Sequence, residues 1–316
     1  MKLSVIIPTL NRANLLLKAL DSLLHQTFSQ EFFEVIVVDN GSNDETKEVV
    51  ESFNGKIKNL VYIYDQSPGL HIGRHQGLLA SHSNILVYAD DDIKAFPSWL
   101  EAIYDSFSKS DVALVGGKNI PEFEETPPQW IYESWLQGGD KKMLSELSIL
   151  DFGDKEIDIS PLYVFGCNFS IRKDILLQAG GFHPDGMPFD LIRYRGDGET
   201  FVSEYILSKG YRTIYNPKAS VYHFVPKKRL NKEYFFHRAY IQAISDSYTS
   251  VRNNKKSYIF IRVLKFYIKK YIFLRDVEIE RSYLKGYLYH QKEVNSDSDL
   301  LSWIKRESYV YDGKIN

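Results

Sequence analysis

The sequence predicts an α/β sandwich around a mostly parallel central sheet, followed by a helical extension. Short apolar runs alternate with helical patterns through the first half of the chain, as expected for strands covered by helices on both faces. From residue 231 onward no strand alternation remains, and the sequence becomes helical, basic and aromatic. We therefore expect one α/β domain over residues 1–229 and a helical extension over residues 230–316.

Each expected strand is short and mostly apolar, and a turn or a polar cluster ends it. The expected strands are 3–7, 34–38, 60–64, 85–89, 112–115, 165–171 and 211–215. The expected helices are 14–26, 44–53, a segment ending near 80, 97–107, a segment starting at 173, and 199–209. Leucines recur at helical spacing in the first helix, and Pro97 stands at the start of the fourth, where proline is favoured. Residues 118–160, rich in proline and tryptophan, are predicted to be an irregular functional loop.

Composition excludes several classes of protein. The chain has 316 residues and a formal net charge of -2, so no global basic field is present to hold nucleic acid. Cys167 is the single cysteine, and therefore no intramolecular disulfide can form. No secretory signal opens the sequence, and no apolar run approaches the ~20 residues of a membrane-spanning helix. These features predict a cytoplasmic protein.

Three polar clusters each follow the end of an expected strand in the first half. They are Thr9-Leu10-Asn11-Arg12, Asp39-Asn40 and Asp90-Asp91-Asp92. In parallel α/β sheets, ligands bind in a crevice at the carboxyl ends of the strands. We therefore expect the three clusters to converge on one crevice.

The aspartate triplet Asp90-Asp91-Asp92 indicates a cation site. Adjacent carboxylates repel one another, and no structural role requires three of them. Hard divalent ions such as Mg²⁺ and Mn²⁺ bind carboxylate oxygens, often together with the phosphates of a substrate. The alternative is a solvated acidic turn.

The clusters near Thr9 and Asp39 allow two interpretations. Asp39 could accept a hydrogen bond from a base N–H or a ribose hydroxyl, Thr9 could contact the base, and Arg12 could bind a phosphate. Both clusters also fit ordinary turns between a strand and a helix, in which polar residues cap the helix.

Two common nucleotide-binding fingerprints are absent. Gly69, Gly73 and Gly77 do not form G-x-G-x-x-G, and G-x-x-x-x-G-K-[ST] does not occur. A Rossmann dehydrogenase and a P-loop enzyme are therefore disfavoured. Arg74, in the same glycine-containing loop, is a candidate ligand for a diphosphate or else a surface arginine.

Six motifs in order along residues 2–225 together resemble a known family. They are Pro8-Thr9-Leu10-Asn11-Arg12, Val37-Val38-Asp39-Asn40-Gly41-Ser42, Gly69-Leu70-His71-Ile72-Gly73-Arg74-His75-Gln76-Gly77, Asp90-Asp91-Asp92, Gly166-Cys167-Asn168 and Gly180-Gly181-Phe182. The set resembles the inverting glycosyltransferases of family 2, which have the GT-A fold. Gly73 and His75 depart from the family pattern, which commonly has Ala and Asn there.

The resemblance implies a binding site for a nucleotide sugar, with a UDP-sugar as the expected donor. Asp39 would contact the nucleobase, and Asp91 would lie near the ribose. The expected donor-binding residues are Pro8, Thr9, Asn11, Arg12, Asp39, Asn40, Ser42, Gly69, Arg74, Asp90, Asp91 and Asn168.

The resemblance also implies a divalent cation, Mn²⁺ or Mg²⁺, beside the diphosphate. Asp90 and Asp92 would surround the cation, with Asp92 as the direct ligand. His223 stands where related enzymes often place a histidine near the metal or the diphosphate, although a histidine beside aromatic residues is also often a packed core residue. The basic run 227–229 could neutralise the departing diphosphate or form a solvated turn.

Inverting transfer requires a base that takes the proton of the acceptor hydroxyl, and the family supplies it from an acidic motif at a helix start. The matching stretch here is Arg195-Gly196-Asp197-Gly198-Glu199-Thr200, in which Gly198 separates the two carboxylates. We expect Glu199 to be the base, with Asp197 as the alternative. A carboxylate at a helix N-terminus can also serve the helix dipole alone.

The predicted function is therefore transfer of a sugar from a nucleotide sugar to a hydroxyl of a glycan or a lipid-linked acceptor. Residues 1–117 would bind the donor, and residues 118–229 would form the acceptor side. Two alternatives remain at this point. One is a catalytically silent nucleotide-sugar-binding protein on the same fold, and the other is a nucleotidyltransferase.

Residues 257–275 are predicted to contain a basic amphipathic helix, with Arg262, Lys265 and Lys269 on one face. Such a helix can lie in the interface of a membrane, where lipid-linked acceptors are found, and the protein would then bind the cytoplasmic face. The alternative is a helix that packs on the catalytic domain with its lysines in water.

Overall fold

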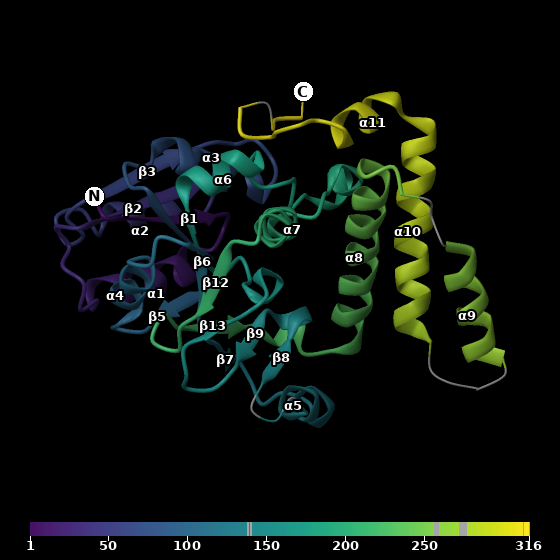
Figure 1. The fold of residues 1–316 in the computed structure, drawn as a ribbon, viewed down its shortest axis with the longest axis horizontal. Coiled ribbons are helices and arrows are strands. Elements are labelled where there is room, and N and C mark those ends of the chain that lie inside the picture. Colours follow the sequence, from purple (N-terminus) through teal and green to yellow (C-terminus); the bar gives the residue numbers. More distant parts are fainter. Residues whose placement is uncertain (138, 140, 256–258, 272–276, 312, 316) are drawn as a thin grey trace.

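The computed structural model describes residues 1–316 except 138, 140, 256–258, 272–276, 312 and 316. It contains a large mixed sheet flanked by helices, a smaller second sheet, and a group of C-terminal helices on one side (Figure 1). The predicted α/β sandwich with a helical extension is confirmed.

The large sheet has eight strands in the order β10-β12-β6-β11-β4-β1-β2-β3. Its strands are β1 (Leu3–Thr9), β2 (Phe33–Asp39), β3 (Leu60–Tyr64), β4 (Ile85–Ala89), β6 (Val112–Gly116), β10 (Ile157–Asp158), β11 (Asn168–Arg172) and β12 (Arg212–Tyr215). The β4-β1-β2-β3 half is parallel throughout, whereas β11 is antiparallel to both of its neighbours. Because β1 and β4 are adjacent and parallel, the residues that follow Thr9 and Ala89 leave the sheet at the same edge.

The core lies on both faces of the large sheet. Alternate residues of a strand face opposite sides, so Val5 and Val35 join one apolar cluster and Ile6 and Ile36 join the other. The first cluster includes side chains of α1 (Ala13–Leu24), α2 (Thr46–Glu51) and α4 (Trp99–Ser106). The second includes side chains of α3 (Leu70–Ala80), α6 (Lys173–Ala179) and α7 (Glu199–Lys209). Burial on both faces explains why these strands are almost continuously apolar.

The expectation of an irregular stretch over residues 118–160 was wrong, because much of it belongs to a second sheet of order β5-β13-β7-β9-β8. That sheet is formed by β5 (Ile93–Ala95), β7 (Asn119–Phe123), β8 (Lys142–Leu144), β9 (Ile149–Asp151) and β13 (Val221–Val225), and α5 (Gln129–Leu136) packs beside it. Pro121 argued against a strand, since proline cannot donate to a ladder. In the structure β9 pairs with β7 at Asn119 alone, so one edge of β7 is open at Pro121.

Four helices form the C-terminal extension: α8 (Lys232–Arg252), α9 (Ile259–Tyr271), α10 (Glu278–Ser296) and α11 (Ser298–Ile304). Asn231 caps α8 by accepting a hydrogen bond from the Tyr234 N–H. α8 and α10 lie side by side (Figure 1), and Gly286 permits their close contact, because a Cβ there would stand 2.2 Å from the Tyr240 carbonyl oxygen. The two long helices of the extension are thereby packed against each other.

The predicted amphipathic helix corresponds to α9, and the ends of the predicted segment, 257–258 and 272–275, lie outside the described residues. Phe266 of α9 packs against Val277 and Leu284, whereas Ile261 and Leu264 are exposed. In the described part of the chain, no helix combines the length and apolarity needed to cross a bilayer. Contact of this helix with a membrane surface stays a prediction.

The end of the chain returns to the α/β domain. The Gly313 carbonyl lies 2.9 Å from His71 Nε2 of α3, and the Ser308 hydroxyl donates to the Gly180 carbonyl at 2.8 Å. Val310 is buried in the apolar cluster that α3 and α6 share. The C-terminal segment therefore helps to fix α3, the helix that carries Arg74.

Buried neutral histidines should make the protein sensitive to mild acid. His290 is fully buried between Ser247 and the Arg193 carbonyl, and burial lowers its pKa to about 4. The unfolded chain, with a histidine pKa near 6.5, binds this proton more readily, so the contribution to stability is complete above about pH 6.5 and falls as the pH drops toward 4. At pH 5 the expected loss is about 2 kcal/mol from His290.

Urea unfolding at pH 7.5 and pH 5 measures this effect. We expect His290→Gln to lose less stability between the two pH values than the wild type does. His25→Gln, at an exposed histidine, should keep the wild-type difference. Equal pH dependence in the His290 variant and the wild type would contradict the assignment.

Candidate active site

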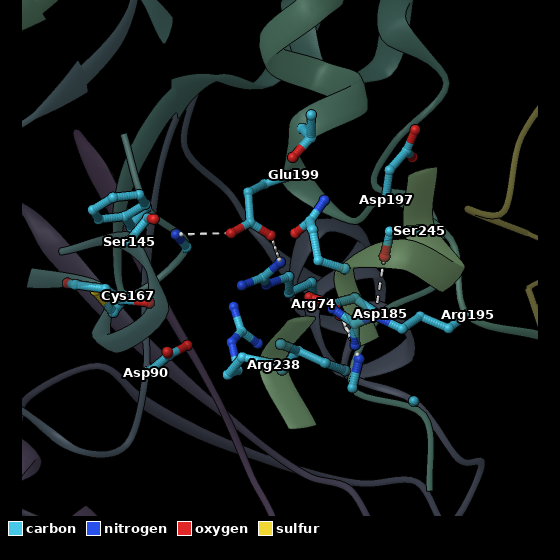
Figure 2. A pocket seen from close by; sticks show the side chains of 18 of the residues that line it. Arg74, Asp90, Ser145, Cys167, Asp185, Arg195, Asp197, Glu199, Arg238 and Ser245 are labelled. Carbon is cyan, nitrogen blue, oxygen red and sulfur yellow. Dashed lines mark hydrogen bonds and ion pairs between the residues drawn. The ribbon is translucent and has the colours of Figure 1, made fainter. Parts of the chain in front are cut away.

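A large pocket opens at the carboxyl ends of β1 and β4, as expected for an α/β sheet. Its volume is about 1140 Å³, and its wall includes Pro8, Asp90, Glu199 and residues of the C-terminal helices. Figure 2 shows Glu199 and Arg74 facing the side of the pocket that carries Asp90. The pocket therefore brings together the aspartate triplet and the predicted base, which are about 100 residues apart in the sequence.

Asp91 links the loops that follow β1 and β4. Its Oδ2 accepts the Thr9 hydroxyl at 2.7 Å, and its Oδ1 accepts from the Arg12 guanidinium at 2.9 Å. The same Arg12 nitrogen also lies 3.1 Å from Asp92 Oδ2. These bonds fix the triplet against the first loop, and Thr9, Arg12 and Asp91 all line the pocket.

Asp92 is the carboxylate best placed to share a cation. His223 Nε2, from β13, lies 3.4 Å from Asp92 Oδ1, and Arg229 lies 3.7 Å from Oδ2. Burial alone would raise the pKa of Asp92, but His223, Arg229 and Arg12 hold it below its ordinary value. Asp92 Oδ1 is buried without a hydrogen bond, as is His223 Nδ1 on the far side of the ring. The aspartate is thus ionised, and one of its oxygens is unsatisfied.

Asp90 lines the pocket, and no hydrogen bond or ion pair joins its side chain to another described residue, although the charges of Arg74 and His223 act on it. Burial and the charge of Asp92 raise its pKa. No set of three His, Cys, Asp or Glu side chains in the described ranges forms a complete metal site. An ion of the Mg²⁺ type needs no such set, since one or two carboxylates and substrate phosphates suffice. The unsatisfied oxygen of Asp92 fits an ion held in that way.

Glu199 begins α7 on the opposite wall. Its Oε2 accepts from Arg74 at 3.1 Å, and its Oε1 accepts from the Gly166 N–H at 3.2 Å. Arg74 is buried beneath it, whereas the Glu199 side chain keeps 25% exposure toward the pocket. A Cβ at Gly166 would stand 2.2 Å from the Arg74 guanidinium, so only glycine permits this contact. Glu199 is therefore oriented and still open to a ligand.

Asp197 has a different environment, although it also lines the pocket. Its Oδ1 lies 2.6 Å from His183 Nδ1, and its Oδ2 accepts the Thr249 hydroxyl at 2.5 Å. Only 6% of its side chain is exposed. Both of its oxygens are engaged by protein groups, and the aspartate joins the start of α7 to α8.

Four predicted donor-binding residues do not line the pocket: Asn11, Asp39, Ser42 and Asn168. Asp39 accepts hydrogen bonds from the N–H groups of Gly41 and Ser42 and from the Tyr62 hydroxyl. Asn11 and Ser42 bond the two loops to each other. Asn168 is buried, where it accepts from the Trp99 indole and donates to the Ala219 carbonyl. In this structure these four side chains shape the loops and the core around the site.

Pro8, Asn40, Gly69 and Arg74 line the pocket, and donor binding by these four residues stays a prediction. Within the basic run, Arg229 also reaches the pocket, whereas Lys227 pairs with Glu125 away from it. Of the basic run 227–229, Arg229 is therefore the residue to which the predicted role of neutralising the diphosphate applies.

Sequence reasoning missed the wall that the C-terminal helices supply. One side of α8 and two tyrosines of α10 line the pocket, as do Asp185 and Arg195, which form an ion pair at 2.6 Å. A signal was present in α8, where polar residues recur at helical spacing from 234 to 249. The same spacing also describes an ordinary solvent-exposed helix face, so the sequence alone could not assign it to a site.

The fold brings the aspartate triplet and the carboxylate of Glu199 into one pocket. This arrangement is typical of the GT-A class of glycosyltransferases. The chain belongs to glycosyl transferase family 2, whose family model matches residues 4–179. Membership sets aside the nucleotidyltransferase and the catalytically silent binding protein in favour of a glycosyltransferase.

Named relatives agree with this class. The chain is similar to the glucosyl-dolichyl phosphate glucuronosyltransferase of Haloferax volcanii, with 25% identity over 270 residues that cover 82% of each protein. The mannosyltransferase PcManGT from Pyrobaculum calidifontis, solved with GDP-Man and Mn²⁺, shares the fold with a TM-score of 0.57 at 18% identity. That match covers 98% of this chain and 85% of the other. TarS from S. aureus, solved with UDP, has a TM-score of 0.51 at 17% identity, covering 94% and 92%.

Proposed function

We propose that this glycosyltransferase moves a sugar, with inversion, from a UDP-sugar to a hydroxyl of a glycan or lipid-linked acceptor. The observation that carries the proposal is that Asp92 and Glu199 both line one pocket. Asp92 has an unsatisfied oxygen for a cation, and Glu199 is exposed toward the space between the walls.

The donor would bind on the wall formed by β1 and β4. Thr9 and Arg12 fix the aspartate triplet there, and Arg229 adds a positive charge beside Asp92. Asp92 and His223 would hold a divalent cation together with the diphosphate. When bound, such a cation acts as a Lewis acid for the departing nucleoside diphosphate. Arg12 and Arg229 would stabilise the same leaving group by their charge.

Glu199 would take the proton from the attacking acceptor hydroxyl as that oxygen bonds to the anomeric carbon. Arg74 and the Gly166 N–H hold the carboxylate in place by donating one hydrogen bond to each of its oxygens. The bond to the diphosphate breaks in the same step, so no covalent intermediate with the protein forms. Asp197 would position the start of α7 through His183 and Thr249.

The UDP assignment is supported by TarS, which was solved with UDP, whereas PcManGT was solved with GDP-Man. The name of the Haloferax volcanii relative, a glucosyl-dolichyl phosphate glucuronosyltransferase, indicates a lipid-linked sugar as that enzyme's acceptor. For the present chain, the pocket volume of about 1140 Å³ supports an acceptor larger than a single sugar.

A thermal-shift screen of UDP-, GDP- and dTDP-sugars with and without Mn²⁺ tests the proposal. We expect a UDP-sugar to raise the melting temperature only when Mn²⁺ is present, because a ligand of the native state stabilises it. The same mixture with an acceptor should then release UDP. Release of pyrophosphate from a nucleoside triphosphate, with no turnover of any nucleotide sugar, would contradict the proposal.

A further inference from the structure

The pocket-facing side of α8 is polar along most of its length. Tyr234, Arg238, Gln242, Ser245 and Thr249 all line the pocket, at intervals of three or four residues that place them on one helix face. These positions span about 22 Å at ~1.5 Å per residue. The aromatic ring, the guanidinium and the amide are groups that can bind a polar, extended ligand, whereas the hydroxyls of Ser245 and Thr249 donate to the Gly196 carbonyl and to Asp197. This face forms part of the wall of the same pocket that the aspartate triplet lines.

Arg238 differs from the neighbouring arginines of the pocket. Arg74 is paired with Glu199, and Arg195 is paired with Asp185. Arg238 is half-buried and lines the pocket, yet across the described ranges of the chain it has no hydrogen bond and no ion pair. Figure 2 shows its side chain pointing from α8 into the space bounded by Arg74 and Asp90. A half-buried cation in a pocket is most stable when an anionic group binds beside it and pairs with its charge.

The charge of Arg238 also reaches Asp185, another carboxylate of the pocket wall. Burial would raise the pKa of Asp185, but Arg195, Arg74 and Arg238 together lower it, so the charge of Arg238 acts near Asp185. The proposed diphosphate position at Asp92 already has Arg12 and Arg229. Arg12 and Arg229 pair with Asp92, whereas Arg238 belongs to α8 and its charge acts near Asp185.

We propose that Arg238 binds an anionic group of the acceptor, a phosphodiester or a carboxylate, and thereby selects anionic acceptors. A guanidinium offers two parallel N–H donors to either group, which gives both affinity and orientation. The hydroxyl to be glycosylated would then be presented to Glu199 while the charged group is held by α8. This inference rests on the proposed function and names the class of its acceptor.

Matched acceptors and Arg238 variants test the inference. The probes are a short-chain glucosyl phosphoprenol, the same glucosyl prenol without its phosphate, and a disaccharide that contains glucuronic acid. For each probe, calorimetry in the presence of UDP and Mn²⁺ gives the affinity, and initial rates with the donor give kcat and KM. We expect the wild type to prefer at least one anionic probe over the neutral one, and the two anionic probes separate the phosphodiester from the carboxylate.

Arg238→Gln should weaken binding of the preferred anionic probe by about tenfold to a hundredfold, the value of a charge-assisted hydrogen bond. Its affinity for the neutral probe, its kcat and its affinity for UDP should stay near the wild-type values. Arg238→Lys should restore part of the loss, and Lys232→Gln, which removes an exposed charge from the same helix, should change none of these quantities.

Two results would overturn the inference. One is a wild type that binds charged and neutral probes equally or binds neither anionic probe, and the other is an Arg238→Gln variant that loses UDP affinity in proportion. Failure of the proposed function is a separate outcome, because it appears as absence of UDP release from every donor. Binding of the anionic probes is measured independently of that release.

Discussion

Replacement of Glu199 by glutamine is expected to reduce sugar transfer by about 10²–10⁴-fold, the usual contribution of a general base. Glutamine keeps the size of the side chain and can still accept from Arg74, so the pocket should keep its shape. The amide cannot take the proton of the acceptor hydroxyl. Initial-rate measurements should therefore show the loss in kcat, while calorimetry shows UDP-sugar affinity within about twofold of the wild type.

Asp197→Asn is the matched control, because it neutralises the other carboxylate of the same motif. We expect its transfer rate to fall less than that of Glu199→Gln. Its free energy of unfolding should fall by about 1–3 kcal/mol, because His183 and Thr249 would no longer hydrogen-bond to a charged carboxylate. Normal transfer by Glu199→Gln together with an inactive, stably folded Asp197→Asn would reverse the assignment of the base.

Asp92→Asn is expected to remove the dependence of donor affinity on the metal. Mutation of a residue that hydrogen-bonds to a metal ligand lowers metal affinity or activity by about 10–100-fold. Mutation of Asp92, as a direct ligand, should lower the Mn²⁺ affinity by at least as much. Titration of Mn²⁺ into a mixture of protein and UDP measures the change. The affinity for UDP without the metal should change little, because Asp91 and Arg12 still order the loop.

Glu204→Gln is the control for Asp92→Asn. Glu204 is another carboxylate of the pocket wall, but it lies on α7, away from the triplet. Its removal should leave the Mn²⁺ dependence of UDP binding unchanged. If Asp92→Asn keeps the wild-type Mn²⁺ dependence, then Asp92 does not hold the cation, and Asp90 becomes the residue to test.

Much of the fold was predictable because buried strands and helices have characteristic patterns of apolar residues in the sequence. Strands such as β1 and β2 are buried on both faces, so their residues are almost all apolar, and the helices between them repeat leucine at helical spacing. The second sheet was not predictable in this way. Its strands are short, and Pro121 occupies a position where one strand edge is open, which no local pattern distinguishes from a loop.

The site was predictable where residues are adjacent in sequence and follow a strand, as Asp90, Asp91 and Asp92 do. It was less predictable where a motif residue has a structural partner. Asp39 matches the family motif, but its oxygens are used by a turn and by Tyr62. Arg238 could not be found from sequence, because only the packing of α8 against the α/β domain turns that arginine toward the pocket.

The anomeric configuration of the transferred sugar tests the central claim most directly. The claim is that Glu199 activates the acceptor for a single displacement of the nucleoside diphosphate across the pocket from Asp92. NMR of the product, compared with the donor, should show an inverted configuration at the anomeric carbon. A retained configuration would contradict the account, since a single in-line displacement inverts the anomeric carbon.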